Sequence, residues 1–228
     1  MLTNQSKTPN PDIGLDFGEI AQFHGYPFEE YSVTTSDGYI LQLFRIPHGL
    51  NDTYSEGRPA ILLQHGLIDP SDAFIVRGPE LSPGFYLANS GYDVWAANSR
   101  GSTYGQNHTT LDPDTDPEFY QFSFPNMMLD HQANIQFILN QTGLQTISYL
   151  GFSSGVTSML VGLIRQNQWF TDRLNLLISV GGLALMNNIS GIPLANFGNH
   201  IPFEICRKFN INRYPPTDEY IRTTSSFI

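Results

Sequence analysis

The chain has 228 residues, of which 40% are hydrophobic and 14% are charged. This length and composition indicate one globular domain with a real core and exclude a disordered chain. The formal net charge is −10, from 21 acidic and 11 basic residues, so we expect repulsion of nucleic acids and no nucleic-acid partner. We interpret the negative charge mainly as a source of solubility. The second interpretation is that the protein works in an acidic compartment, where many of its carboxylates would be partly protonated.

The sequence carries few signals of targeting or cross-linking. Residues 1–7 lack the apolar stretch of a signal peptide, and the most apolar stretch, residues 174–186, is shorter than the about 20 residues that span a bilayer. Cys206 is the one cysteine, interpreted as a buried apolar residue or as the partner of a cysteine outside the chain. Five glycosylation sequons favour a secretory route and a glycoprotein, at Asn4, Asn51, Asn107, Asn140 and Asn188.

Strand and helix patterns alternate along the chain after a polar lead-in, residues 1–14. Two alternating segments, residues 30–35 and 39–46, flank Ser36-Asp37-Gly38 and predict an antiparallel hairpin. Continuous apolar runs predict strands buried on both faces at residues 59–64, 92–97, 147–150 and 174–180. Helical spacing predicts helices at residues 81–90, 124–142 and 156–168.

This alternation predicts an α/β fold with a mostly parallel, twisted sheet and a leading antiparallel hairpin. The core is predicted to cover residues 15–182. The alternation stops at about residue 181, where Gly, Pro, Asn and Phe become frequent. Residues 183–228 are therefore predicted to begin an insertion.

The sequence Gly151-Phe152-Ser153-Ser154-Gly155 lies between a predicted buried strand and a predicted helix. At such a turn the serine adopts a strained backbone conformation that lifts its Oγ clear of the sheet. Side chains at the two glycines would collide across the junction, and the helix N-terminus would place N–H groups near a developing oxyanion. We predict Ser153 as a nucleophile; the alternative is a helix cap without chemistry.

Gln64-His65-Gly66-Leu67 follows the preceding buried strand. In α/β-hydrolases, one oxyanion donor is the N–H after the nucleophile and the other comes from the loop after the third strand. The predicted donors are therefore the backbone N–H groups of Ser154 and Leu67. We interpret His65 as structural, because the triad order is serine, acid, histidine and His65 precedes Ser153.

The chain resembles the acid lipases, the family of gastric and lysosomal acid lipases, over roughly residues 17 to 185. The matching stretches are Gly25-Tyr26-Pro27, Glu29-Glu30-Tyr31, Thr35-Ser36-Asp37-Gly38-Tyr39-Ile40-Leu41, Arg45-Ile46-Pro47, Gln64-His65-Gly66-Leu67, Gly91-Tyr92-Asp93-Val94-Trp95, Asn98-Ser99-Arg100-Gly101, Phe122-Ser123-Phe124 and the turn at Ser153. The resemblance implies the α/β-hydrolase fold and hydrolysis of triacylglycerols or steryl esters in lipid catabolism. It implies secretion or lysosomal targeting, no cofactor and no metal, and is compatible with peripheral contact at a lipid interface.

The sequence departs from the family pattern near its predicted nucleophile. Phe152 stands where the family usually has histidine, and Ser154 stands where it usually has glutamine. The family's acid and histidine lie far downstream of the nucleophile, beyond a lid-bearing insertion. Asp172 and His200 follow Ser153 in the right order, but Asp172 precedes a core strand instead of following one, and Asp218 has no histidine after it.

We therefore expect the triad acid and histidine to be missing from this chain, a fragment truncated within the lid or cap insertion. The first hypothesis is an ester hydrolase of the acid lipase type, largely inactive as this chain alone. A non-catalytic lipid-binding fragment is the alternative from another class. Acyl transfer on the same fold is a third hypothesis.

Overall fold

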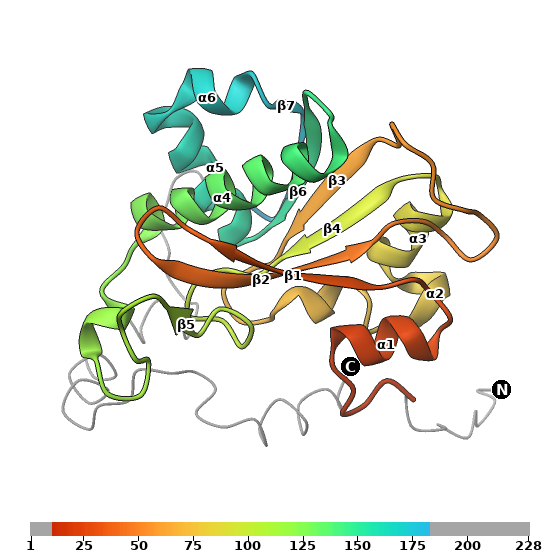
Figure 1. Cartoon of the computed structure of the whole chain (residues 1–228), viewed down its shortest axis with the longest axis horizontal. Coiled ribbons are helices and arrows are strands. Elements are labelled where there is room, and N and C mark those ends of the chain that lie inside the picture. The colour runs from red at the N-terminus through yellow and green to blue at the C-terminus, as the bar shows by residue number, and fades with distance from the viewer. Residues whose placement is uncertain (1–10, 183–228) are drawn as a thin grey trace, which may run out of the picture.

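The computed structural model describes residues 11–182, in which a seven-stranded sheet is flanked by helices (Figure 1). The strands are β1 (Glu29–Thr34), β2 (Tyr39–Ile46), β3 (Ala60–Gln64), β4 (Asp93–Ala97), β5 (Asn107–His108), β6 (Ile147–Phe152) and β7 (Leu174–Val180). The α-helices are α1 (Phe17–Phe23), α2 (Gly78–Leu81), α3 (Pro83–Asn89), α4 (Phe124–Thr142), α5 (Ser154–Arg165) and α6 (Asn167–Thr171). Two 3₁₀ turns are η1 (Ser71–Phe74) and η2 (Pro117–Tyr120). Some predictions concern residues that the structure does not describe. These are the insertion at 183–228 and the residues Asn4, Asn188, His200, Cys206 and Asp218.

The sheet has the strand order β1-β2-β4-β3-β6-β7, and β5 pairs with β2 off this path. The pairs β1–β2 and β2–β4 are antiparallel, whereas β4–β3, β3–β6 and β6–β7 are parallel. The predicted fold, a mostly parallel sheet behind a leading antiparallel hairpin, is therefore confirmed. Parallel pairing aligns the C-terminal ends of β3 and β6, so the segments that follow these strands meet at one edge.

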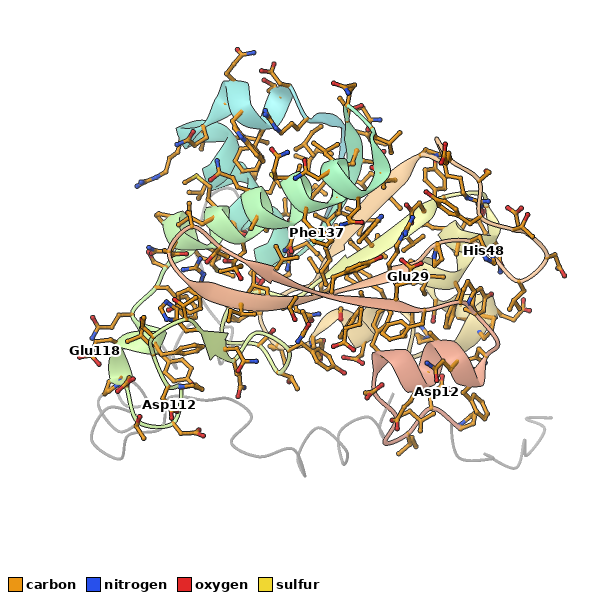
Figure 2. The ribbon with its side chains drawn as sticks, viewed as in Figure 1. Asp12, Glu29, His48, Asp112, Glu118 and Phe137 are labelled. Atoms are coloured by element: carbon orange, nitrogen blue, oxygen red, sulfur yellow. The ribbon has the colours of Figure 1, made fainter. Side chains whose placement is uncertain are left out.

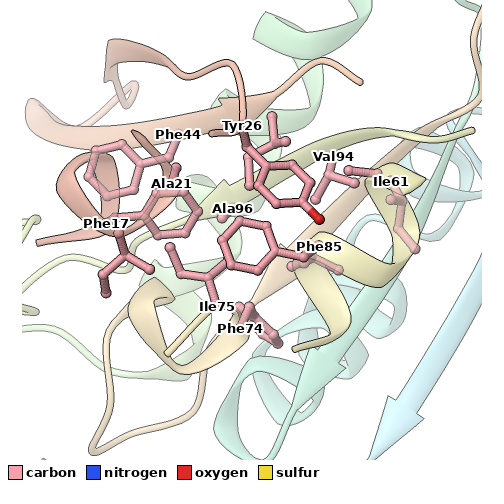
Figure 3. Packing of buried hydrophobic residues seen from close by; sticks show 14 residues of the cluster. Phe17, Ala21, Tyr26, Phe44, Ile61, Phe74, Ile75, Phe85, Val94 and Ala96 are labelled. Atoms are coloured by element: carbon pink, nitrogen blue, oxygen red, sulfur yellow. The ribbon is translucent and has the colours of Figure 1, made fainter. Parts of the chain in front are cut away.

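The central strands are buried on both faces because alternate side chains enter two separate cores. On β3, Ile61 and Leu63 join a core with α1 and α3, whereas Ala60 and Leu62 join a core with α4, α5 and α6. Figure 3 shows the first core, to which Phe17 of α1, Phe44 of β2 and Phe85 of α3 contribute aromatic rings. Phe137 of α4, labelled in Figure 2, packs against the second core, and its ring centroid lies 5.1 Å from that of Tyr31.

The helices differ from the prediction in three places. The predicted helix 81–90 corresponds to α3, which begins at Pro83 because proline fits the first turn of a helix, and Leu81 instead ends a separate helix, α2. The predicted helix 156–168 begins at Ser154 and is divided at Gln166, whose φ of −133° is not helical. Helix α1 was not predicted; it follows a capping box of Asp16 and Glu19.

Strand β7 is correctly predicted as a strand, but the prediction that it is buried on both faces is wrong. Its residues are partly or fully exposed along its whole length. Within the described residues it pairs on one side with β6, and its other edge has no strand beside it. An apolar run can predict a strand, but burial depends on which elements cover it.

Residues 11–14, the described part of the predicted lead-in, form turns that contact the core. Asp12 is buried, and its Oδ1 lies 2.8 Å from His24 Nε2 at the end of α1.

Candidate active site

Ser153 occupies the turn between the last residue of β6 and the first residue of α5. Its φ and ψ are 51° and −116°, and it is the one non-glycine residue with positive φ among residues 11–182. Its N–H donates to the Val180 carbonyl at 2.8 Å, and its carbonyl accepts the Val156 N–H at 3.1 Å. The predicted strained backbone is confirmed, and the surrounding hydrogen bonds hold a conformation that serine on its own avoids.

The two flanking glycines permit close contacts that a larger residue would prevent. A Cβ at Gly155 would lie 2.6 Å from the His65 carbonyl oxygen and 2.8 Å from the Gln64 carbonyl oxygen. A Cβ at Gly151 would lie 2.9 Å from the Val156 backbone nitrogen. The predicted collision across the strand–helix junction is confirmed at Gly151, whereas a Cβ at Gly155 would instead collide with the end of β3 and the loop that follows it.

The loop after β3 lies directly against the Ser153 turn. A Cβ at Gly66 would lie 3.2 Å from Ser153 Cβ and 3.1 Å from Phe152 Cδ1. Leu67 follows this contact, and its side chain is 71% exposed, so it does not anchor the loop by packing. The structure thus brings the segment of Leu67 to the turn that contains Ser153 and Ser154. Ser154 is the first residue of α5, where N–H groups have no partner within the helix.

Buried hydrogen bonds fix the loop after β3 to the loop after β4. His65 Nε2 accepts the Ser99 N–H at 3.0 Å, and His65 Nδ1 lies 2.6 Å from the Gly66 carbonyl oxygen, to which it donates. Gln64 Nε2 donates to Ser99 Oγ at 2.9 Å. Burial lowers the pKa of His65 to about 4, so its ring is neutral and both nitrogens are occupied. The structural interpretation of His65 is consistent with this geometry.

Sequence reasoning did not find an ion network around the buried side chain of Arg100. The Arg100 guanidinium binds Asp130, with Nε to Oδ1 at 2.8 Å, and also both oxygens of Asp37, at 2.6 and 2.9 Å. It also lies 4.0 Å from the centroid of the Tyr39 ring. Burial raises the pKa of Asp130 to about 6, against the opposing charge of Arg100. The network joins the β1–β2 turn, the loop after β4 and α4.

No histidine or carboxylate within residues 11–182 is hydrogen-bonded to Ser153. Each described histidine binds another group; these are His24, His48, His65, His108 and His131. Asp172 lies at the far end of β7, because Leu174 pairs with Ile147 while Val180 pairs with Phe152. Six residue steps along β7, from Leu174 to Val180, span about 20 Å, so Asp172 does not serve as the triad acid.

Apolar side chains are exposed around the turn. Phe152, whose ring contacts Gly66, is 44% exposed, and its cross-strand partner Val180 is 42% exposed. Leu67 and Ile68 on the facing loop are more exposed still. Exposed apolar residues gathered at one place favour an apolar ligand or partner there.

The described part of the chain contains no group of three or more His, Cys, Asp or Glu side chains arranged to hold a metal ion. In residues 11–182, no helix combines the length and the hydrophobicity required to cross a membrane.

Comparison with known proteins agrees with this geometry. The family described as "alpha/beta hydrolase fold" matches residues 59–215, and the "Partial alpha/beta-hydrolase lipase region" matches residues 17–78. Gastric triacylglycerol lipase of Bos taurus is 45% identical over 150 residues, which are 65% of this chain and 38% of that one. Lysosomal acid lipase/cholesteryl ester hydrolase of Homo sapiens is 36% identical over 217 residues, 93% of this chain and 53% of that one. The chain belongs to the acid lipase family of α/β-hydrolases.

Other members of the acid lipase family show the same extent of matching. The tear acid lipase-like protein of Mesocricetus auratus is 40% identical over 187 residues, 81% of this chain and 46% of that one. The chain therefore spans about half the length of the curated relatives it matches or less, between 36% and 53%.

Proposed function

We propose that this protein is a serine hydrolase of neutral lipid esters and that Ser153 is its nucleophile. The observation that carries the proposal is the positive φ of Ser153 between β6 and α5, a strain that a structural serine does not require. The names of two relatives specify triacylglycerol and cholesteryl ester, and we propose esters of this class as substrates.

In the proposed reaction, Ser153 Oγ attacks the ester carbonyl carbon, and the backbone N–H groups of Ser154 and Leu67 stabilise the oxyanion. The bond between Oγ and the acyl carbon forms, and the alcohol leaves with the proton that the hydroxyl loses. Water then attacks the acyl carbon, which releases the carboxylic acid and restores the hydroxyl. The close approach of Gly66 to Ser153 supports a position for Leu67 beside the reacting carbonyl.

The described residues supply no general base for Ser153. We therefore propose that residues 11–182 alone react orders of magnitude more slowly than a serine with a complete triad, because an unactivated hydroxyl is a weak nucleophile. The proposed remainder of the site is a histidine and an acid outside these residues.

Lipid binding without catalysis is the second candidate function. It is supported by Phe152, Leu67 and Val180, which expose apolar side chains around a serine to which no described histidine is hydrogen-bonded. In this case Ser153 would be a part of the site wall, and its hydroxyl would not react.

Reaction with an alkyl fluorophosphonate distinguishes these functions. Hydrolase function predicts slow labelling of the whole chain that is lost in Ser153→Ala, whereas Ser154→Ala, which keeps the backbone N–H, should label within about 3-fold of the natural chain. Unchanged labelling in Ser153→Ala would contradict the proposal. Lipid binding without catalysis would be supported if the natural chain and Ser153→Ala bound a fluorescent fatty acid with equal affinity and neither was labelled by the fluorophosphonate.

We further propose that residues 15–182 form the N-terminal part of the hydrolase core and that residues 183–228 begin the cap insertion.

The names of the gastric and lysosomal relatives support a secreted or lysosomal location. The described sequons at Asn51, Asn107 and Asn140 are exposed, which supports their proposed glycosylation. Peripheral contact with a lipid interface is supported by the exposed apolar residues around Ser153.

A further inference from the structure

A buried polar pair lies one turn into α5, behind the segment that carries Ser153. His131 of α4 and Ser158 of α5 are both fully buried, and His131 Nε2 lies 2.7 Å from Ser158 Oγ. Ser158 Oγ also lies 3.0 Å from the Ser154 carbonyl oxygen and 3.2 Å from the Gly155 carbonyl oxygen. The pair therefore joins α4 to the first two peptide units of α5.

The geometry determines which atom donates. A hydroxyl has one hydrogen, and the two carbonyl oxygens near Ser158 Oγ can only accept. If Ser158 donated to His131, its oxygen would face both carbonyls without a proton between them. The satisfied arrangement is His131 Nε2–H to Ser158 Oγ and Ser158 Oγ–H to the Ser154 carbonyl. Tyr149, also fully buried, supplies a second donor to the Gly155 carbonyl at 2.8 Å.

The surroundings of His131 Nδ1 are consistent with the tautomer that carries its proton on Nε2. His131 Nδ1 has no hydrogen-bond partner in the described part of the chain. An unpaired acceptor is tolerated in protein interiors more readily than an unpaired N–H. Burial lowers the pKa of His131 to about 3, so the ring is neutral and carries one proton, which we place on Nε2.

His131 and Ser158 do not form a second catalytic pair. Both side chains are completely inaccessible, so a substrate carbonyl cannot reach Ser158 Oγ. Their hydrogen bonds instead end on the peptide units that immediately follow the nucleophile. The Ser154 carbonyl belongs to the same residue whose N–H is the proposed oxyanion donor.

We propose that His131 is a positioning residue, which holds the Ser154 peptide through Ser158 so that its N–H points at the oxyanion. This inference rests on the proposed function of Ser153. It requires a donor at position 131, because the Nε2–H bond holds Ser158 Oγ in place, whereas an acceptor there would compete with the Ser154 carbonyl for the Ser158 hydrogen. A small displacement of a catalytic group lowers the rate of the chemical step by a large factor. A loosened Ser153 turn should therefore lower the rate constant of the reaction more than the affinity for the reagent.

Three variants of the whole chain test this inference. His131→Gln keeps an N–H donor, His131→Leu removes it at similar volume, and Ser158→Ala removes the intermediate hydroxyl. For each, the fluorophosphonate reaction is measured over a concentration series, which separates the limiting rate constant from the concentration at half-maximal rate. Thermal unfolding followed by circular dichroism controls for folding.

His131→Leu and Ser158→Ala should lower the limiting rate constant by about 10-fold with little change in the half-maximal concentration, and His131→Gln should remain within about 3-fold. The double variant His131→Leu/Ser158→Ala should be no slower than either single one, because both remove one hydrogen-bond chain. Full rate in folded His131→Leu, or an equal loss in His131→Gln, would overturn the inference.

Nuclear magnetic resonance separates failure of this inference from failure of the proposed function. The natural chain should show a slowly exchanging proton coupled to His131 Nε2, and Ser158→Ala should make it exchange faster. Amide exchange at Ser154 and Gly155 should accelerate in His131→Leu but not in His131→Gln. These signals need no reaction at Ser153. A proton on Nδ1, or unchanged exchange in His131→Leu, would overturn the positioning role even where labelling succeeds.

Discussion

Replacement of Ser153 by glycine should stabilise the protein relative to replacement by alanine. Alanine keeps the Cβ that makes a φ of 51° with a ψ of −116° unfavourable, whereas glycine has no Cβ. A residue in such a conformation costs about 1–3 kcal/mol, and the greater unfolded-state freedom of glycine offsets about 0.5–1 kcal/mol. The expected net gain is about 1 kcal/mol, or roughly 2–4 °C in Tm for a domain of this size.

The assay is chemical denaturation of Ser153→Gly and Ser153→Ala under the same conditions, with calorimetry as a second measure. Both variants lose the hydroxyl, so the comparison isolates the backbone conformation from the chemistry. The natural chain should resemble Ser153→Ala, because serine and alanine share the Cβ. If Ser153→Gly were equal to or less stable than Ser153→Ala, the turn would not be strained and the main support for a nucleophile would be lost.

Three further predictions follow from other parts of the structure. Gly155→Ala should destabilise the protein by about 1–3 kcal/mol in urea denaturation, because the new Cβ collides with carbonyls of the β3 loop; unchanged stability would mean that this loop is free to move. Burial raises the pKa of Asp72 to about 6, so the folded state binds this proton more tightly than the unfolded state, and stability should fall by about 2 kcal/mol as the pH rises from 4 to 6. Asp72→Asn should flatten this part of the pH profile, and an identical profile would contradict the assignment. Secretory expression followed by glycosidase digestion should reveal glycans at Asn51, Asn107 and Asn140, each lost in its Asn→Gln variant; a chain whose mobility never shifts would refute their modification.

The parts of the fold that depend on local patterns could be predicted from the sequence. The run of residues 59–64 predicts a strand with two buried faces, and Ile61 and Leu62 do enter different cores. The turn at Ser153 could be predicted because its two glycines mark close backbone contacts. Helix α1 was missed although its signal was present, since Asp16 and Glu19 have the spacing of a capping box.

The parts that depend on distant contacts could not be predicted in this way. Arg100 binds Asp37 and Asp130, which are 63 and 30 residues away in sequence, and no local pattern pairs them. His131 and Ser158 are separated by 27 residues and meet only because α4 packs against α5. The exposure of β7 likewise depends on which element lies beside it, a property that its own apolar residues do not contain.

The most direct test of the account is to locate the acyl group after the protein meets an ester. The whole chain is mixed with a long-chain p-nitrophenyl ester, quenched in acid, digested and examined by tandem mass spectrometry. We predict that an acyl group accumulates slowly on Ser153, with release of one equivalent of p-nitrophenol for each modified chain and no adduct in folded Ser153→Ala. An acyl group on another residue, or equal release of p-nitrophenol from the natural chain and Ser153→Ala, would contradict it.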